Sequence, residues 1–368
     1  MLIVHVVGSA KADDTTLGVE RNVVYLAAEQ QRLGHQISIL INTQGAFTDI
    51  CAELGIPVIV AAELDSVGGG LAGPDDHTML QLTARFKELD PDLIHCHSLG
   101  AASDAIPVAN RLGIPCVFDC EMSGLVIAAQ RVGMRFATIC CCRESFEDFT
   151  KSGVEDVYFV PTGTRAVTAA HPTQSTSTSL IFAGSLQVRK GLDVALLAMV
   201  ELRRRRGERC PVLNIYGSGD EEAYLKEIAA MFGLDDIVKF HGFQSGVLER
   251  CPSSDILLLP SRLEHAPLVV LEAMSRGMPV VATDVGDVAA MIPDHRFGRV
   301  VPAEAVLALA DAVESMLADI GEGRFDPRLP IERHSALYST DILAKNTCAV
   351  YEQVQPARSP VEREAIMR

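Results

Sequence analysis

Two glutamates, Glu264 and Glu272, are separated by seven residues in the segment 260–283, the stretch with the clearest chemical potential in the chain. The preceding residues 255–259 are almost all aliphatic and predict a buried parallel strand. Glu264 is therefore expected on a loop at the carboxyl end of a strand. In an open α/β sheet, ligands bind at that edge. The alternative interpretation is a solvated acidic pair that flanks an ordinary helix.

A short helix is predicted directly after Glu264. Pro267 can begin it because proline lacks an N–H that the first turn would leave unused, and Gly277 can end it. Glu272 then lies one to two turns into this helix. The backbone N–H groups of residues 265–268 have no partner within the helix, so they could bind hydroxyl groups or a phosphate.

Two neighbouring cations, Arg189 and Lys190, follow a strand predicted at 179–183. They stand at the start of a predicted helix, where the helix dipole disfavours positive charge. Two cations in this position are therefore expected to meet a bound anion. The alternative is that they form only the solvated first turn of the helix.

The composition indicates a parallel α/β protein with two domains. The chain has 368 residues, of which 48% are hydrophobic and 28 are glycine. Its net charge of −16 argues against nucleic acid or an anionic membrane as the main partner. The one basic run, 203–206, ends a predicted helix, where cations suit the helix dipole, so a solvated helix end is expected.

Neither a membrane span nor a signal peptide is predicted. No apolar stretch is long enough to cross a bilayer, and residues 1–7 enter a strand at once. We therefore expect a cytoplasmic protein without stable membrane insertion.

The cysteines do not predict a metal site. The chain has 10 cysteines, including the run 140–142, but their spacing matches no paired Cys-x-x-Cys pattern. Cys116, Cys120 and the run 140–142 lie in apolar segments, where free cysteine behaves as a small buried hydrophobe. His95 and His97 could join them around a metal ion, but the prediction is that no metal site is present.

Alternating strands and helices predict two doubly wound domains in series. In the first half, strands are expected at 2–7, 36–41, 57–60, 92–96, 115–119, 137–141 and 157–160, and helices near 19–33, 79–89 and 101–112. In the second half, strands are expected at 179–183, 211–216, 236–240, 255–259 and 279–283, and helices at 191–206, 220–232, 267–276 and 303–318. The predicted domains are 1–167 and 180–335, with a Thr/Ser-rich linker at 168–179. The segment 336–368 is expected to be a helix that returns to the first domain, followed by a frayed tail.

Several short motifs, together with the two glutamates, give the chain a family resemblance. They are Phe182–Asp193, Ile215–Asp220, Phe240–Phe243, Asp92–His97 and Val160–Gly163. With them, the chain resembles, over most of its length, the retaining nucleotide-sugar-dependent glycosyltransferases of family 4. The resemblance implies the GT-B fold, in which two Rossmann-like α/β domains face each other across a cleft that closes over the donor. It assigns the acceptor to the first domain and the nucleotide sugar to the second.

The resemblance also implies roles for residues of the second domain. Lys190 reaches the donor diphosphate and Arg189 adds a second cation, so both stabilise charge that develops on the leaving phosphate. Glu264 faces the donor sugar, and Glu272 accepts hydrogen bonds from the ribose hydroxyls. The remaining donor-binding positions are Gly184, Ser185, Gly217, Gly219, Phe243, His265, Ala266, Pro267, Leu268 and Val269.

The chain departs from the family's pattern in four places. Ser185 stands where the family has an arginine. Glu121 stands where it commonly has a histidine that touches the donor sugar, and a glutamate there favours an acceptor with a hydroxyl or amine group. The paired glycines of the N-terminal loop read Leu17-Gly18, with Gly18 as the expected binding position. Segment 286–290 lacks the family's final glutamate.

The predicted function is transfer of a sugar, with retention, from a nucleotide sugar to a soluble small molecule or glycan. The resemblance implies front-face attack without a metal ion. A UDP-linked donor is favoured, and it is a co-substrate, so no separate cofactor is expected.

Two alternatives remain open, because one fold hosts many functions. The first is a non-catalytic homologue that binds a nucleotide sugar and acts as a scaffold or activator. Ser185 and Glu121 favour it, whereas the intact Lys190, Glu264 and Glu272 disfavour it. The second is a sugar-nucleotide epimerase or hydrolase of the same fold.

Overall fold

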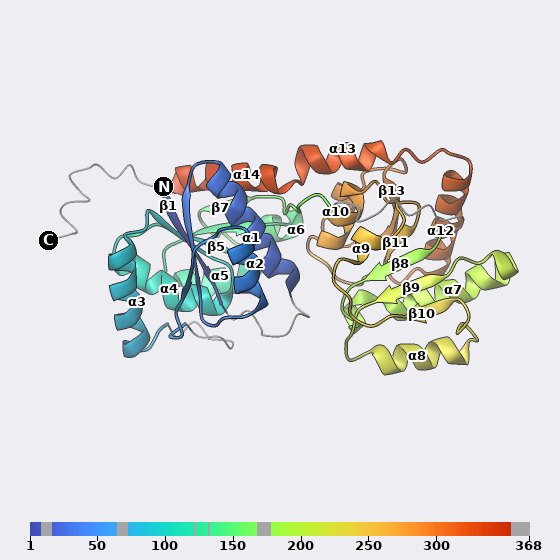
Figure 1. Cartoon of the computed structure of the whole chain (residues 1–368), viewed down its shortest axis with the longest axis horizontal. Coiled ribbons are helices and arrows are strands. Elements are labelled where there is room, and N and C mark those ends of the chain that lie inside the picture. Colours follow the sequence, from blue (N-terminus) through green and yellow to red (C-terminus); the bar gives the residue numbers. More distant parts are fainter. Residues whose placement is uncertain (9–16, 65–72, 121–122, 132, 168–177, 355–368) are drawn as a thin grey trace. The chain divides into compact units, whose positions relative to one another are not determined.

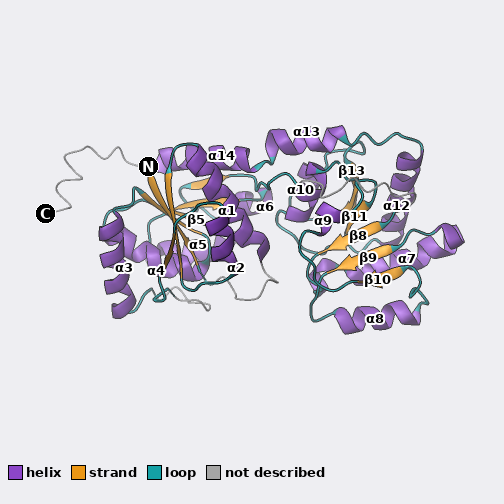
Figure 2. Ribbon diagram, in the orientation of Figure 1, coloured by secondary structure: helices purple, strands orange, loops and turns teal. Residues whose placement is uncertain are grey.

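The computed structural model describes residues 1–8, 17–64, 73–120, 123–131, 133–167 and 178–354. The chain divides into two compact units. Unit 1 comprises Met1–Thr162 and Thr340–Arg368, and unit 2 comprises Gly163–Ser339. Each unit is a Rossmann-like α/β domain built on a parallel sheet (Figure 1, Figure 2).

Unit 1 contains a seven-stranded parallel sheet with strand order β3-β2-β1-β4-β5-β6-β7. The strands are β1 Leu2–Val7, β2 Gln36–Ile41, β3 Val58–Val60, β4 Leu93–Cys96, β5 Cys116–Asp119, β6 Ala137–Cys140 and β7 Val157–Phe159. The helices are α1 Leu17–Arg32, α2 Ala46–Glu53, α3 Asp76–Leu89, α4 Leu99–Arg111, α5 Ser123–Arg131, α6 Arg143–Lys151 and α14 Thr340–Val354. Both faces of the sheet are buried, which is why its strands read as continuous aliphatic runs.

The C-terminal helix α14 packs against α1 of unit 1 (Figure 1), as the sequence predicts. Tyr351 on α14 is fully buried in the same core as Ile3 and Val24. The segment that belongs to unit 1 begins at Thr340 rather than at residue 336, because α13 (Arg328–Leu337) packs on α10 (Leu268–Ser275) of unit 2.

Unit 2 contains a six-stranded parallel sheet with strand order β10-β9-β8-β11-β12-β13. The strands are β8 Leu180–Ala183, β9 Leu213–Tyr216, β10 Val238–Phe240, β11 Ile256–Leu259, β12 Val280–Thr283 and β13 Gly298–Val301. The helices are α7 Leu192–Arg206, α8 Glu222–Met231, α9 Val247–Arg250, α10 Leu268–Ser275, α11 Val288–Met291, α12 Val306–Gly321 and α13, and the short 3₁₀ turns are Val188–Lys190 and Gly207–Arg209.

The first unit ends earlier than the predicted boundary at residue 167. Thr164 forms a bridge with Ser339, and its N–H donates to the carbonyl oxygen of Tyr338 at 2.8 Å. The N–H of Val167 donates to Oγ of Ser275 at 3.0 Å. These contacts attach residues 163–167 to unit 2. The predicted linker falls mostly on residues 168–177, which lie outside the described residues.

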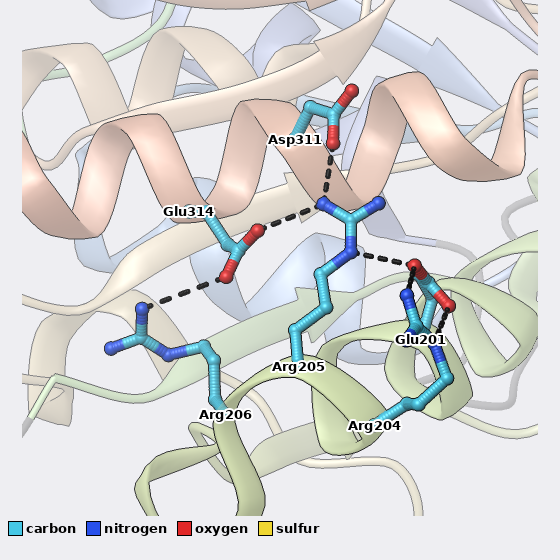
Figure 3. A network of polar contacts seen from close by, with 6 residues as sticks. All are labelled: Glu201, Arg204, Arg205, Arg206, Asp311 and Glu314. Carbon is cyan, nitrogen blue, oxygen red and sulfur yellow. Dashed lines mark hydrogen bonds and ion pairs between the residues drawn. The ribbon is translucent and has the colours of Figure 1, made fainter.

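The basic run 203–206 forms the last turn of α7, and Arg205 and Arg206 join this helix to α12 (Figure 3). Arg205 donates to Glu201 on its own helix and to Asp311 and Glu314 on α12. Arg203, Arg204 and Arg206 pair with Asp236, Glu201 and Glu314 respectively. The expected helix end is therefore confirmed in position, and its cations have acidic partners within unit 2.

Among the described residues, no helix combines the length and apolar character required to cross a membrane.

Candidate active site

The strand order of unit 2 brings two of the predicted segments together. β8 and β11 are neighbours at the centre of the sheet although they are distant in sequence. The order reverses between them, and in open α/β sheets such a switch point opens the crevice that binds ligands. The turn with Arg189 and Lys190 follows β8, and the loop with Glu264 follows β11.

Glu264 is the centre of a cluster of polar contacts at this switch point. Nζ of Lys190 donates to its Oε1 at 2.6 Å, and Oγ of Ser261 donates to the same atom at 2.8 Å. A guanidinium nitrogen of Arg189 lies 3.5 Å from Oε2. Only 8% of the Glu264 side chain is exposed, so burial strengthens these contacts and makes them necessary to the carboxylate.

The two cations differ in exposure. The side chain of Lys190 is 14% exposed, whereas that of Arg189 is 45% exposed. Arg189 also donates to Oε1 of Gln187 at 3.0 Å. Lys190 is therefore held at the site, and Arg189 lies at its open side, where it can meet an anion from solvent.

The turn Val188–Lys190 lies directly against the end of β11. Gly191 follows the turn with φ 63°, a left-handed conformation that suits glycine. A side chain at position 191 would place its Cβ 2.1 Å from the carbonyl oxygen of Pro260. Glycine at this position therefore permits the close approach of the cationic turn to the Glu264 loop.

Pro267 precedes α10, which begins at Leu268, so the predicted helix start is observed. The predicted binding positions His265, Ala266, Leu268 and Val269 surround this start and are partly buried, whereas Pro267 is buried. The first N–H groups of a helix lack intrahelical acceptors and favour an anion or a hydroxyl oxygen. Glu272 lies one turn inside α10 and is partly buried.

The two glycines of the turn after β9 pack against the loop after β8. Gly217 has φ 151°, and a Cβ there would lie 1.8 Å from the carbonyl oxygen of Gly184. A Cβ at Gly219 would lie 2.3 Å from the carbonyl oxygen of Leu186. The structure thus gives these glycines a packing role between neighbouring loops. Their predicted approach to a nucleotide stays a prediction.

The turn after β9 also contacts the segment that ends at Phe243. The N–H of Gly217 donates to the carbonyl oxygen of Gly242 at 2.9 Å. Phe243 is 44% exposed. Two residues before it, His241 stacks on Tyr216 at the end of β9, with the ring centroids 4.6 Å apart. The loops after β8, β9 and β10 therefore form one connected rim.

Two of the predicted site residues belong to unit 1. Gly18 lies in the first turn of α1. Glu121 lies outside the described residues. Ser185, which replaces the family's arginine, follows Gly184 and is partly buried.

Sequence reasoning missed the hydroxyl of Ser261, which is completely buried and donates to Glu264. Its own carbonyl oxygen accepts from Oγ1 of Thr283 at 2.5 Å, so the loop is tied to β12 as well. The sequence did contain a signal, because Ser261 lies just after the buried strand and three residues before Glu264.

Unit 1 contains a separate ring of polar contacts at β1, β4 and β5. Nδ1 of His5 and Nε2 of His97 are 2.8 Å apart, and Nδ1 of His97 lies 2.7 Å from Oδ2 of Asp119. Nε2 of His95 lies 2.9 Å from Oδ1 of Asp119, and its Nδ1 lies 2.7 Å from the hydroxyl of Tyr351.

Gln30 on α1 closes this ring. Its Nε2 donates to the Tyr351 hydroxyl at 3.1 Å, and its Oε1 lies 2.7 Å from Nε2 of His5. Burial lowers the pKa of His5 well below its usual value, and it also lowers the pKa of His97. Burial alone would raise the pKa of Asp119, but the two neighbouring imidazoles lower it well below its usual range. We call these six residues the histidine ring.

Within the described residues, His5, His95 and His97 form the one group with the composition of a metal site. Each of their nitrogens already has a protein partner, and the His5–His97 separation is that of a hydrogen bond. We therefore assign the group as a hydrogen-bonded ring. The ten cysteines are free thiols, and all except the partly buried Cys141 are buried.

The whole fold is that of the GT-B glycosyltransferases. The crystal structure of Anabaena HepE in complex with UDP superimposes with a TM-score of 0.78 at 18% identity, over 96% of this chain and 100% of that chain. Residues 165–324 match the family described as "Glycosyl transferases group 1", and residues 18–150 match the "Glycosyl transferase 4-like domain". The chain belongs to the family 4-type glycosyltransferases.

Curated relatives are similar in sequence to about half or to most of this chain. Alpha-D-kanosaminyltransferase of Streptomyces kanamyceticus is 32% identical over 181 residues, which are 48% of this chain and 45% of that protein. The match thus spans about half the length of this relative. Glycogen synthase of Mycobacterium tuberculosis is 25% identical over an alignment of 401 residues, which covers 95% of each chain.

Proposed function

We propose that the protein is a retaining glycosyltransferase that moves a sugar from a UDP-linked donor to a soluble small-molecule or glycan acceptor. The observation that carries the proposal is the cluster of Lys190, Arg189 and Glu264 at the switch point of unit 2. Two cations beside one buried carboxylate leave net positive charge at the edge where ligands of such sheets bind. A diphosphate group complements that charge.

The solved structures of similar fold favour uracil as the base. Structures of Anabaena HepE contain UDP, UDP and glucose, and UDP-glucose. We extend UDP to this chain as the proposed nucleotide, while the sugar is left open. The net charge of −16 disfavours an acceptor embedded in an anionic membrane and supports a soluble one.

The proposed reaction exchanges one bond at the anomeric carbon. The bond from this carbon to the β-phosphate oxygen breaks, and the acceptor hydroxyl attacks from the same face. Its proton passes to the leaving phosphate, so atoms and charge balance. Lys190 stabilises the charge that develops on the diphosphate, and Arg189 adds to it, so we propose that the transfer needs no metal ion.

The contacts of Glu264 support a mechanism without a protein nucleophile. Its Oε1 already accepts hydrogen bonds from Lys190 and Ser261, which stabilise the carboxylate and reduce its reactivity. A retaining glycosidase instead uses one carboxylate as a nucleophile and a second as an acid. Glu264 is better suited to bind sugar hydroxyls and to hold Lys190 in place.

A non-catalytic scaffold is the weaker alternative. Ser185 favours this alternative, because it stands where the family has a second phosphate-binding cation. Arg189, however, reaches the Glu264 carboxylate, so the site retains two cations. This arrangement supports an active enzyme.

The proposal is tested by incubating the protein with a panel of UDP-, GDP- and ADP-sugars and candidate acceptors and by measuring release of the nucleoside diphosphate. We expect release from one UDP-sugar that depends on acceptor and is lost in Glu264→Gln. Donor binding without release under any acceptor would favour the scaffold. No binding of any donor would contradict the proposal.

A further inference from the structure

We infer that Arg262 is a positioning residue, which fastens the turn that carries Arg189 and Lys190 to the loop that carries Glu264. The inference rests on the proposed function for its catalytic consequence. Arg262 lies in the loop after β11, two residues before Glu264. Its side chain reaches the segment after β8, more than 65 positions away in sequence.

The guanidinium of Arg262 binds both ends of the cationic turn. One terminal nitrogen donates to the carbonyl oxygen of Val188 at 2.7 Å and to Oδ1 of Asp193 at 2.8 Å. The other donates to Oδ2 of Asp193 at 2.6 Å. Val188 begins the turn, and Asp193 lies in the first turn of α7, directly after it. The guanidinium therefore spans the segment that carries Lys190.

The backbone of Arg262 makes a third attachment to the same segment. Its N–H donates to the carbonyl oxygen of Arg189 at 2.7 Å. One residue thus binds Val188, Arg189 and Asp193 at once. Because the loop after β11 also carries Glu264, these bonds set the distance between Lys190 and that carboxylate.

The Arg262–Asp193 pair is suited to this role by geometry and burial. It is bidentate, and the two side chains are 24% and 33% exposed. A planar bidentate pair fixes orientation as well as distance. Burial alone would raise the pKa of Asp193, but the bonds from Arg262 lower it, so the carboxylate stays charged.

Glu304, before α12, makes an outer contact with the same guanidinium. Its side chain is 57% exposed, so solvent weakens this interaction. We assign the fastening to Asp193 and the backbone contacts, and we expect Glu304 to contribute little.

The catalytic consequence follows from the short distances at Glu264. Nζ of Lys190 lies 2.6 Å from Oε1 of Glu264. A shift of the turn would move this cation away from the leaving phosphate. A misplacement of about 1 Å in an active site can reduce the rate about 100-fold. Arg262 itself is not expected to touch the donor.

The test compares Arg262→Ala and Arg262→Lys with the control Arg296→Ala. Arg296 also forms a bidentate pair, with Asp294, but lies on the connection between α11 and β13. Hydrogen exchange of the peptides spanning 187–195 and 260–266 is measured first, without substrate. We expect exchange about 10-fold faster in Arg262→Ala, an intermediate rate in Arg262→Lys and no change in the control.

The second readout is turnover, separated from nucleotide affinity. In Arg262→Ala we expect kcat to fall about 10- to 100-fold while the Kd for UDP changes by no more than about threefold, with partial recovery in Arg262→Lys. Unchanged exchange would overturn the fastening. Faster exchange with wild-type kcat would overturn the positioning role. A wild-type protein that turns over no nucleotide sugar would overturn the proposed function, whereas the exchange measurement decides the fastening without it.

Discussion

The switch points of the two sheets use polar residues differently. In unit 1, the switch point lies between β1 and β4, and the six members of the histidine ring each contact two others of the ring. In unit 2, it lies between β8 and β11, and two cations converge on one buried carboxylate. The ring satisfies its own polar groups, whereas the cationic cluster has charge left over at its exposed side.

This difference separates a stabilising network from a binding site. A satisfied polar network gains little from a ligand, and removal of one member takes one buried partner from each of its two neighbours. An excess of positive charge at the carboxyl edge of a sheet instead favours an anion. We therefore expect substitutions in the histidine ring to change stability, and substitutions in the cationic cluster to change nucleotide binding and turnover.

The largest effect is expected for Glu264→Gln. The amide keeps the shape but cannot hold Lys190 by charge, so we expect kcat to fall about 1,000-fold with a Kd for UDP within about threefold of wild type. Glu222→Gln is the matched control, because Glu222 forms an exposed pair with Lys226 at 2.7 Å on α8. Wild-type turnover in Glu264→Gln would remove this residue from the mechanism.

Lys190→Ala should have the next largest effect. We expect kcat to fall about 100-fold and the affinity for UDP to fall about 10-fold, because the cation binds the diphosphate and stabilises its departure. Lys226→Ala serves as the control for loss of a lysine paired with a glutamate. Steady-state kinetics and titration calorimetry measure the two quantities, and an unchanged UDP affinity would place the diphosphate elsewhere.

Glu272→Ala tests the proposed ribose contact. We expect the Kd for UDP to rise about 10- to 30-fold, because hydrogen bonds to a charged carboxylate are lost, with a smaller change in kcat. Loss of kcat with unchanged affinity would contradict the role of Glu272 in nucleotide binding. Such a result would give it the part that we propose for Glu264.

Tyr351→Phe breaks the histidine ring without creating a large cavity. The hydroxyl contacts Gln30 and His95, so its loss leaves two buried polar groups without that partner. We expect the free energy of unfolding to fall by about 1–3 kcal/mol, measured by urea denaturation, with unchanged UDP affinity. A large loss of UDP affinity with wild-type stability would show that the comparison between the two switch points is wrong.

The smallest predicted effect is a dependence of stability on pH that differs between the units. The pKa values of His5 and His97 are lowered by burial, so the unfolded chain binds protons that folded unit 1 does not. Unit 1 should therefore lose stability as pH falls through about 6.5. The lowered pKa of Asp119 extends this loss below about pH 4.

Unit 2 contains buried groups whose protonation changes its stability in opposite directions. Burial raises the pKa of Asp255 to about 6, so this group favours folding as pH falls through that value, whereas the lowered pKa of His334 opposes it. Hydrogen exchange at pH 7.5 and 5.5, measured separately for peptides of each unit, should show that unit 1 loses more stability at the lower pH. His5→Gln should reduce this loss of stability. Equal slopes in both units would contradict the prediction.

The local structure around the candidate site of unit 2 could be predicted because it depends on short sequence segments. The aliphatic run before Glu264, the proline before α10 and the paired cations after Gly184 each define a strand end or a helix start. The predicted strands and helices of both sheets were found with small shifts at their ends. Strand β13 was missed because its sequence, Gly-Arg-Val-Val, is short and interrupted by an arginine.

Contacts between residues far apart in the sequence could not be predicted from such short segments. His95 contacts Tyr351 across 256 positions, and Arg262 contacts Asp193 across 69. No local sequence pattern predicts such pairs, since they depend on which strands become neighbours in the sheet. The sequence placed His95 on the predicted strand 92–96 and His97 directly after it, but it gave no sign that His5 and α14 complete their ring. Likewise, the packing role of Gly217 became visible only when the loops after β8 and β9 lay side by side.

Isothermal titration with UDP, GDP and ADP shows whether the cationic switch point of unit 2 binds a nucleoside diphosphate. Wild type, Lys190→Ala and Tyr351→Phe are compared at one pH. We expect UDP to bind most tightly, Lys190→Ala to weaken UDP binding about 10-fold and Tyr351→Phe to leave it unchanged. Absence of binding by all three nucleotides, or equal UDP affinity in Lys190→Ala and wild type, would show that this switch point does not bind the diphosphate.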